Sequence, residues 1–337
     1  MNAKDLLQYS NSLNVIQGEN MNIEALTDLK ALKANHLIFI KNKKFLIKFD
    51  SNSKKDCGIS VIFDEKLWDK IENKSDYENC CKAILTTSEV DIIISKLSKL
   101  FHDLLFLESI ELTDSRSSDS NTIHTSVQIG ENCFIGNNVS IGEGTIIAPG
   151  VTLMGNIKIG ENCLIYPQAT IYKNVEIGNN ARIHSGSVIG ADGFGYNFKN
   201  GIHHKVWHMG GVIIGDDFEM GANSCVDQGT FSPTKIGNGV KLDNHCQIGH
   251  NGDIGNGVIL CGHAGTAGTV TLGDFTVLGG YVAIGPGLEL GFGCGVGGGG
   301  KVLCDWPANS QISGHPARPL KEWLRGIAWV RKESQRK

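Results

Sequence analysis

Aliphatic side chains recur at every sixth position through most of the chain after residue 122. Steps of six from Ile123 meet twelve aliphatic residues in succession. After one break the ladder resumes for three members, and after a second break it runs for twelve more that end at Val302. Only Thr266 among these positions is polar. A small or medium-sized side chain usually stands two positions earlier, and a Gly with a polar pair often follows.

A period of six fits neither an α-helix, with about 3.6 residues per turn, nor a strand of a flat sheet, with a period of about two. It predicts a mainly β solenoid of short parallel strands, in which the aliphatic residue points inward and Gly or Asn forms the corner. Stacked coils then bury a continuous aliphatic column. The 27 rungs would form nine triangular coils, about 43 Å long at roughly 4.8 Å per coil. The two breaks, at 190–211 and 227–235, should project as loops, where sites are often found.

The first 112 residues predict a separate α/β domain. The segment DLLQYSNSL is expected to open a helix, and HLIFIKN, KKFLIKF and ISVIF are expected to form short strands. From Ser88 to Leu105 apolar residues recur with helical spacing, which predicts a helix leading toward the solenoid. Residues 113–122 carry no apolar side chain and are interpreted as a linker. With it, the predicted solenoid domain spans 113–312.

Residues 313–337 form a third, C-terminal segment, for which a helix is predicted after Pro319. From Leu320 onward it has two glutamates and more basic side chains: Lys321, Arg325, Arg331, Lys332, Arg336 and Lys337. Two interpretations stay open. The helix could be a solvated end cap, or it could be a docking surface for an acidic partner, since such charge speeds and orients encounter.

The overall charge excludes some partners and suggests a compartment. The chain has 337 residues, 31 basic and 35 acidic side chains and a formal charge of −4, which gives no reason to expect nucleic acid. No apolar run approaches the ~20 residues of a membrane span. Residues 1–20 lack the apolar core of a signal peptide, so the cytoplasm is the expected location.

Ten cysteines are present, but a reducing compartment argues against disulfides. Cys133, Cys163, Cys246 and Cys294 fall at inward repeat positions, where a thiol behaves as a small hydrophobe. No Cys-x-x-Cys pair argues for structural zinc. The cysteines are therefore interpreted as core residues.

The segment DNHCQIGHN, residues 243–251, places ionisable and amide side chains inside the repeat. Its polar members should lie at corners or face outward, where they could simply be solvated. His250 is the stronger candidate for chemistry because histidine titrates near neutrality and commonly transfers protons. A metal site of three His donated across neighbouring subunits is the less favoured alternative. Only His203, His204 and His208 are closely spaced, and no metal is expected. GADGFGY lacks the Lys-Ser/Thr of a phosphate loop.

A combination of motifs resembles a known family. In order, GADGFGY, KLDNHCQIGHN, AGTAGTVTLGDFTVLGG and SGHPARPLKEWLR are similar to segments of the UDP-3-O-(3-hydroxyacyl)glucosamine N-acyltransferases of lipid A biosynthesis. The N-terminal FIKNKKF resembles that family's uracil-binding segment. The likeness spans nearly the whole chain, whereas the repeat alone would indicate only the hexapeptide-repeat superfamily.

The resemblance implies a left-handed parallel β-helix and a homotrimer with sites between subunits. The donor would be acyl-carrier protein, which holds the 3-hydroxyacyl chain as a phosphopantetheine thioester, and the acceptor would be the 2-amine of a UDP-sugar, UDP-3-O-acylglucosamine. No tightly bound cofactor is implied. The basic C-terminal segment would then meet the acidic carrier protein.

The resemblance also implies roles for particular residues. His250 would be the general base, and the backbone N–H of Gly268 would stabilise the oxyanion. Asp243, Asn244 and Gln247 would position the substrate.

The same resemblance assigns the nucleotide to the N-terminal domain. Phe39 and Phe45 would sandwich the uracil, and Asn42 would hydrogen-bond its edge.

One departure from the family pattern concerns histidine. Gly287 stands where the family usually has a second His that helps to hold substrate. His263 stands where the family does not usually have His, so it could compensate or be incidental, and it is kept as a candidate substrate contact. A paralogue with altered acyl preference is one hypothesis.

Two other functions stay open from the sequence. An acetyl-CoA-dependent sugar N- or O-acetyltransferase could use the same solenoid, and so could a non-catalytic scaffold. Fold alone does not separate these.

Overall fold

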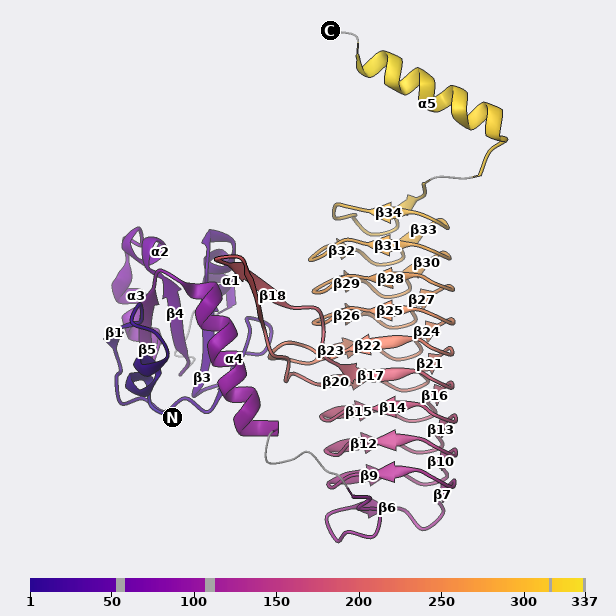
Figure 1. The fold of residues 1–337 in the computed structure, drawn as a ribbon, viewed down its shortest axis with the longest axis horizontal. Helices are drawn as coiled ribbons and strands as arrows, with labels where there is room; N and C mark the ends of the chain where they lie inside the picture. The colour runs from indigo at the N-terminus through magenta and orange to yellow at the C-terminus, as the bar shows by residue number, and fades with distance from the viewer. Residues whose placement is uncertain (53–57, 107–112, 315–316, 336–337) are drawn as a thin grey trace.

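The computed structural model describes residues 1–52, 58–106, 113–314 and 317–335. A small α/β domain lies beside a long parallel β-solenoid, and a C-terminal helix extends beyond the end of the solenoid (Figure 1). This arrangement confirms the predicted mainly β fold with its small N-terminal α/β region and C-terminal helix.

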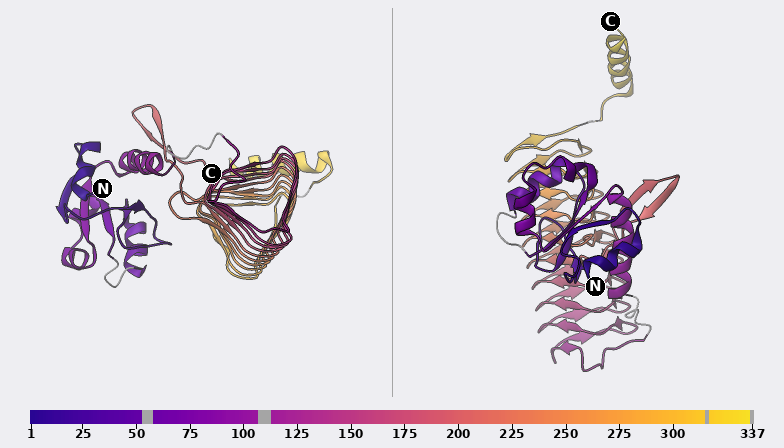
Figure 2. Two further views of the ribbon diagram at one scale, coloured as in Figure 1. Left: turned by 90° about the horizontal axis from the view of Figure 1, so that it is seen from below. Right: turned by 90° about the vertical axis from the view of Figure 1, so that its left-hand side faces the viewer.

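The solenoid consists of three parallel sheets that close a triangular cross-section (Figure 2). We call them face 1, face 2 and face 3. Face 1 has nine strands, from β6 (Thr122–Ile123) to β32 (Glu289–Leu290). Face 2 has ten strands, from β7 (Gln128–Ile129) to β35 (Gln311–Ile312). Face 3 has nine strands, from β8 (Phe134–Ile135) to β34 (Lys301–Val302). Every predicted rung is a strand residue. β35 is one rung more than the sequence predicted, because residues 303–310 interrupt the period before it.

The aliphatic ladder forms the core of the solenoid. Its members from Ile135 to Val302 are at most 4% exposed, and the inward cysteines are equally buried. Corner residues such as Asn138 (φ 56°) and Asn180 (φ 59°) adopt the left-handed conformation that Asn tolerates better than most residues. The nine cysteines in the described parts of the chain are all free. These features match the predicted column and corners.

The N-terminal domain is built on a five-stranded sheet in the order β1-β5-β4-β3-β2. Its strands are β1 (Asn14–Gln17), β2 (Ala25–Leu26), β3 (His36–Ile40), β4 (Ser60–Asp64) and β5 (Ala83–Thr87), and only β1 is antiparallel to its neighbour. Its helices are a 3₁₀ helix at Ala3–Tyr9, α1 (Lys43–Asn52), α2 (Glu65–Asp69), α3 (Lys74–Cys80) and α4 (Val90–Phe106). The expected strands HLIFIKN and ISVIF are confirmed as β3 and β4.

The expected strand KKFLIKF is wrong, because this segment forms helix α1. Leu46 and Phe49 stand three residues apart and so lie on one helical face, which packs into the core with Phe49 fully buried. Asn42 accepts a hydrogen bond from the N–H of Phe45 at 3.2 Å, which is the contact of a helix N-cap. The apolar spacing was compatible with both structures, and the cap favours the helix.

Helix α4 confirms the predicted helix and the first part of its apolar face, since Val90, Ile93, Leu97 and Phe101 are buried, whereas Leu104 and Leu105 at its end are exposed. The interpretation of 113–122 as a linker is wrong for the residues from Ser115 onward. The N–H of Ser115 donates to Ile135 O at 2.7 Å, and the side chain of Asn121 accepts from Val139 N at 2.8 Å. The polar side chains cap the open edge of the first coil, where a further coil would otherwise supply these bonds.

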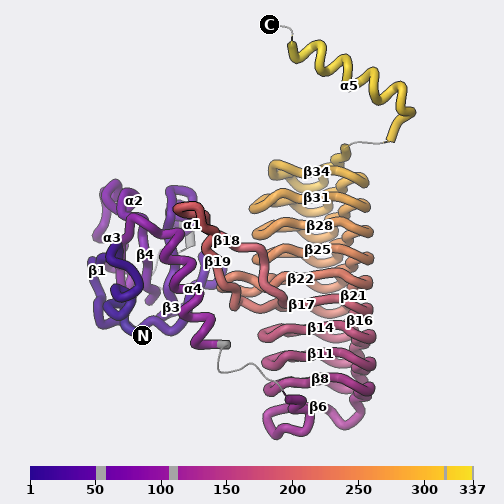
Figure 3. The backbone as a smooth tube through the Cα atoms, in the orientation of Figure 1, coloured from indigo at the N-terminus to yellow at the C-terminus, as the bar shows by residue number. Residues whose placement is uncertain are grey.

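Both breaks in the ladder project from the solenoid, as predicted. The first contains the hairpin β18 (Tyr196–Lys199) and β19 (Ile202–Lys205), which reaches toward α4 (Figure 3). Asn197 donates to Asp91 O at 2.7 Å, and the N–H of Trp207 donates to Ser98 Oγ at 3.1 Å. The second break also meets the N-terminal domain, where Ser232 hydrogen-bonds to Asp28. The two insertions therefore hold the domain against the solenoid.

The C-terminal helix α5 (Leu320–Ser334) has no buried residue. It confirms the helix predicted after Pro319, while Arg336 and Lys337 lie outside the described residues, as do two positions of the SGHPARP motif. Among the helices that the structure describes, none combines the length and apolar character needed to cross a membrane.

Candidate active site

The polar segment 243–251 divides between two corners of the solenoid. Asp243, Asn244 and His245 follow β24 (Lys241–Leu242) at the corner between faces 2 and 3, which we call the 2–3 corner. Strand β25 (Gln247–Ile248) then crosses face 3, and His250 lies at the 3–1 corner, between faces 3 and 1. Six residues of strand span up to about 20 Å. Within one copy of the chain, the structure does not bring Asp243 or Asn244 to His250.

At the 2–3 corner these side chains tie coils together. The Asp243 carboxylate accepts from the N–H of Gly262 at 2.9 Å, and Asn244 Oδ1 accepts from the N–H of Ala222 at 2.7 Å. Nearby, the exposed ring of His263 is stacked between two other rings, His245 at 4.9 Å and Tyr281 at 4.7 Å.

Gly287, in contrast, lies at the 3–1 corner, where its N–H donates to Gly268 O at 3.0 Å. Within one copy, therefore, His263 does not take the place of the histidine that the resemblance leads us to expect at this position.

The ring of His250 is held by Asn251. His250 Nδ1 lies 2.9 Å from Asn251 Oδ1, and that amide oxygen also accepts from Thr230 N at 3.1 Å and Thr230 Oγ1 at 2.7 Å. The N–H of Asn251 donates to Thr234 Oγ1 at 2.9 Å. Because an amide oxygen only accepts, these bonds assign the proton of neutral His250 to Nδ1. Nε2 is then left with a lone pair and can act as a base.

Gly268 stands directly beside that lone pair. A Cβ atom on Gly268 would lie 2.3 Å from His250 Nε2, so only glycine allows this approach. Ala222 and Asn238 occupy the position of Gly268 at other corners of the solenoid, and there the next coil supplies a side-chain acceptor for the backbone N–H. The N–H of Ala222 donates to Asn244 Oδ1, and the N–H of Asn238 donates to Asn256 Oδ1.

The next coil opposite Gly268 carries Pro286, which has no acceptor side chain. In the part of the chain that the structure describes, the Gly268 N–H has no hydrogen-bond partner. The corner therefore offers a base nitrogen and an uncommitted backbone donor side by side.

The first insertion packs onto His250 from outside. A Cβ on Gly193 would stand 2.5 Å from the Cβ of His250, and the ring of His208 lies edge to face with that of His250 at 5.1 Å. GADGFGY thus covers His250 closely.

Gln247 lies on face 3 next to the same corner. Its Nε2 donates to Asp227 Oδ1 at 2.9 Å and to Ile248 O at 3.1 Å. Burial raises the pKa of the Asp227 carboxyl, and the bond from Gln247 opposes that rise. The structure therefore brings Gln247 to the His250 side of the solenoid.

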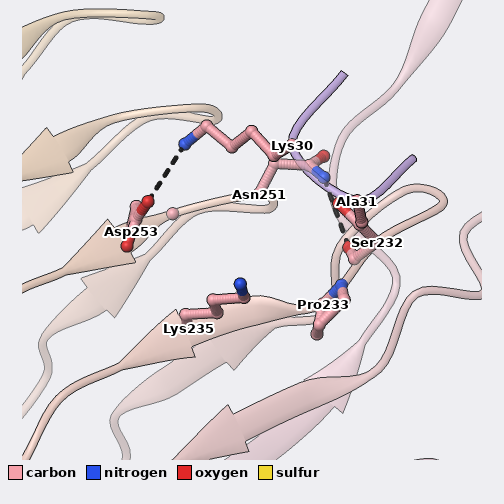
Figure 4. Close-up of a pocket in the computed structure, with 8 residues that line it drawn as sticks. Lys30, Ala31, Ser232, Pro233, Lys235, Asn251 and Asp253 are labelled. Carbon is pink, nitrogen blue, oxygen red and sulfur yellow. Dashed lines mark hydrogen bonds and ion pairs between the residues drawn. The ribbon is translucent and has the colours of Figure 1, made fainter. Parts of the chain in front are cut away.

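A cleft opens beside Asn251 between the N-terminal domain and face 1 (Figure 4). A second, shallow and open depression of about 540 Å³ adjoins it and is lined by Leu29, Lys30, Leu32, Lys235 and Asp253. Lys30 and Asp253 form an ion pair at 3.4 Å across it. The lining of the cleft includes Asn251, the neighbour of His250, but not His250 itself.

The candidate uracil-binding residues belong to the N-terminal domain. Phe39 is only 8% exposed and packs against Phe231 of the second insertion, with ring centroids 6.1 Å apart. Phe45 is 36% exposed on α1, with the Lys41 ammonium 5.8 Å from its ring centroid. Asn42 Oδ1 is occupied as the cap of α1. In the described residues no group of three or more His, Cys, Asp or Glu side chains could hold a metal ion.

Comparison with known proteins agrees with this repeat architecture. Residues 122–155 and 156–191 match the model of the bacterial transferase hexapeptide of six repeats. The solenoid is a hexapeptide-repeat solenoid.

Curated relatives share its sequence. The UDP-3-O-acylglucosamine N-acyltransferase of Helicobacter hepaticus is 49% identical over 207 residues, 61% of this chain and 64% of the relative. The enzyme of the same name from Methylobacterium nodulans is 40% identical over 154 residues, 46% of this chain and 44% of the relative. The chain thus spans less than two thirds of the length of these curated relatives. Their names confirm the resemblance found in the sequence.

Solved structures of UDP-N-acetylglucosamine acyltransferases are also similar to the chain. The protein from Campylobacter jejuni is 28% identical with a TM-score of 0.41, and covers 56% of this chain and 67% of its own. The protein from Francisella novicida is 26% identical with a TM-score of 0.46, and covers 62% of this chain and 70% of its own.

Several residues of this corner of the hexapeptide-repeat solenoid were not identified from the sequence. Thr230 and Thr234 had no assigned role, His208 had been considered only for the disfavoured metal site, and Asn251 was only a member of the polar segment. Thr266, the single polar rung, was one available signal: its hydroxyl accepts from the N–H of Gly249, next to His250, at 3.2 Å.

Proposed function

We propose that the protein transfers a 3-hydroxyacyl chain from acyl-carrier protein to the 2-amine of UDP-3-O-(3-hydroxyacyl)glucosamine, in lipid A biosynthesis. The observation that carries this proposal is the pairing at the 3–1 corner. His250 Nε2 is free to take a proton, and the Gly268 N–H beside it is free to bind a developing negative charge. The names of the curated relatives support the choice of substrate class.

The chemistry follows from these two groups. The amine nitrogen attacks the thioester carbonyl carbon while His250 Nε2 takes one of its protons. The carbonyl oxygen becomes an oxyanion and accepts from the Gly268 N–H. The C–S bond then breaks, and the departing thiolate takes the proton back from His250, leaving an amide and the free carrier thiol. Asn251 stabilises the transient imidazolium by keeping Nδ1–H hydrogen-bonded.

In this proposal the site is completed by a second copy of the chain. Asp243, Asn244 and His263 lie at the 2–3 corner, so they would serve His250 of a neighbouring subunit rather than their own. A homotrimer around an axis parallel to the solenoid would place unlike corners of adjacent copies side by side. Gln247 would position substrate from within the same copy as His250.

The donor and the nucleotide occupy further surfaces in the proposal. Phe39, Asn42 and Phe45 would bind the uracil, and the 3-hydroxyacyl chain would arrive as a phosphopantetheine thioester with no other cofactor. The exposed basic helix α5 would dock the acidic carrier protein. These events are assigned to the cytoplasm.

A direct assay tests the proposal. Purified full-length protein is given UDP-3-O-(3-hydroxyacyl)glucosamine with a series of 3-hydroxyacyl-carrier donors or with acetyl-CoA, and products are identified by mass spectrometry. We expect amide formation from the carrier donors only. Turnover of acetyl-CoA alone would favour the acetyltransferase alternative, and no turnover of either would favour the scaffold.

The assignment of the base has its own test. His250→Ala is expected to lower kcat by about 10²–10⁴-fold. His184→Ala, at the 2–3 corner, removes a ring stacked on Tyr166 and serves as the matched control. A His250→Ala variant that keeps turnover within about twofold of the parent would show that the base is misassigned.

A further inference from the structure

A second imidazole lies against the proposed base and has no part in the mechanism above. The side chain of His208 is completely buried between the hairpin and the solenoid. Its ring centroid is 5.1 Å from that of His250, and the two ring planes meet at 72°. No sequence motif had pointed to this contact, because His208 precedes His250 by one insertion and two coils.

The hydrogen bonding of His208 defines its form. Nδ1 lies 3.1 Å from Val206 O, and because a carbonyl only accepts, Nδ1 carries the proton in the neutral ring. Nε2 then has a bare lone pair, and in the described structure it is buried without a partner. A buried acceptor left unpaired costs free energy. Packing alone would be served better by an apolar ring, so a histidine at this place points to a role beyond packing.

The surroundings keep this ring neutral. Burial and the neighbouring His250 lower the pKa of His208 to about 4, while Asp192 and the Val206 carbonyl oppose that shift and Lys205 adds to it. At the pH of a working acyltransferase His208 is therefore uncharged. A charged imidazole here would repel His250 at the moment it takes up a proton.

The covering loop is shaped around both rings. A Cβ on Gly193 would meet His250 at 2.5 Å, and a Cβ on Gly195 would meet His208 Cε1 at 2.9 Å. Gly193 and Gly195 of GADGFGY thus bring backbone onto each ring at a distance that no other residue allows. The loop, His208 and His250 form one packed unit.

We propose that His208 is a positioning residue that acts through His250. Held by Val206 and kept uncharged, its ring fixes the plane of His250 so that Nδ1 meets Asn251 and Nε2 faces Gly268. The inference rests on the proposed function for its effect on turnover, but the ring geometry that it predicts can be measured without any reaction.

The test compares His208→Ala and His208→Gln with the parent protein. Nitrogen-15 NMR of the histidine rings reports the tautomer of His250, and steady-state kinetics separates kcat from KM. In the parent we expect one His250 tautomer, protonated at Nδ1. In His208→Ala we expect both tautomers and a kcat at least ~10-fold lower, with KM within about threefold.

His208→Gln restores an uncharged N–H donor for Val206 O, so it is expected to recover part of the lost kcat and the single tautomer. His36→Ala is the matched control. Nδ1 of His36 is also buried and unpartnered in the described residues, but His36 lies in the N-terminal sheet, away from the site. It should leave both measurements as in the parent. Thermal unfolding confirms that each variant folds, and if His208→Ala does not fold, His208→Gln and His208→Phe are judged by the same two measurements.

The outcomes that overturn the inference are distinct. If His250 keeps the single tautomer of the parent in His208→Ala, the inference is overturned whether or not kcat falls. A lower kcat would then have a cause other than the orientation of the His250 ring. Mixed tautomers with kcat within twofold would also contradict it. If the parent itself transfers no acyl chain, the proposed function fails, while the tautomer comparison still decides whether His208 holds the His250 ring.

Discussion

A Cβ atom placed on Gly268 would stand 2.3 Å from Nε2 of His250, well inside van der Waals contact. The ring cannot retreat freely, because Asn251 holds Nδ1 at 2.9 Å on its other side. Gly268→Ala is therefore expected to displace the base and lower kcat by at least ~10²-fold, an effect of the size found when an oxyanion-hole donor is lost.

The control for Gly268→Ala is Gly280→Ala, at the 2–3 corner. There the nearest atom to an added Cβ is Gly262 O at 3.4 Å, so the methyl group is accommodated. Steady-state kinetics and thermal unfolding are measured on both variants. Equal activity of the two would remove Gly268 from the proposed oxyanion site.

Asn251 is expected to set the tautomer of His250. Asn251→Gly removes the amide without backbone strain, since residue 251 has φ 58°, a conformation that glycine adopts readily. We expect kcat to fall at least ~10-fold with little change in KM, because the base is mispositioned while the substrate contacts persist.

Asn223→Gly makes the same change at another left-handed corner position, φ 55°, and should leave the kinetics unchanged. If Asn251→Gly raised KM with kcat intact, Asn251 would bind substrate rather than orient the base.

Asn42 carries two roles that one substitution can separate. As the cap of α1 it needs only an oxygen, and as a uracil contact it would need its amide N–H groups. Asn42→Asp keeps the cap and should leave stability within about 0.5 kcal/mol of the parent, whereas Asn42→Ala should lose about 1 kcal/mol. If the amide binds uracil, both variants lose UDP affinity, measured by calorimetry. UDP affinity retained in Asn42→Asp would reduce Asn42 to a structural cap.

The fold was largely predictable because the six-residue period admits one architecture. The period also contains the position of the site. Ile189, Val226 and Ile248 are the twelfth, fifteenth and eighteenth rungs, all multiples of three, so the residues after them share one corner. Both insertions and His250 therefore had to lie on the same edge of the prism.

Other features depended on contacts that no local pattern contains. KKFLIKF has apolar spacing that suits a strand as well as a helix, and the cap by Asn42 decided the outcome. The pairing of His208 with His250 depends on how the hairpin folds back, which follows from its bonds to α4. The polar segment 243–251 is continuous in sequence, yet its two ends lie at different corners of the solenoid, because strand β25 crosses face 3 between them.

Stability at acid pH should depend on His208. Its pKa is lowered from 6.5 to about 4 in the folded protein, so the unfolded chain binds the proton more readily. Above pH 6.5 the ring is neutral in both states and contributes no pH dependence. As the pH falls from 6.5 toward 4, protonation favours the unfolded state and stability is lost.

Between pH 7 and pH 5 this loss amounts to about 2 kcal/mol. His208→Phe removes the titrating group. Between pH 7 and pH 5 the free energy of unfolding of this variant should therefore fall by about 2 kcal/mol less than that of the parent. Urea unfolding at both pH values and one protein concentration measures the difference. Parallel pH dependence in the two proteins would contradict the buried neutral state of His208.

Gly287 provides a gain-of-function test at the same corner as His250. A Cβ there would meet open space, and the φ of +68° is close to those of His245 (57°) and His263 (60°), so the fold already accepts histidine in this conformation. Gly287→His should cost about 1 kcal/mol of stability from the left-handed backbone. If the second histidine of the family that the sequence resembles holds substrate, the variant should have a KM for the UDP-sugar several-fold below that of the parent, with kcat little changed. Gly287→Ala carries the same backbone strain without the imidazole, so equal KM values in the two variants would show that this corner does not contact the sugar.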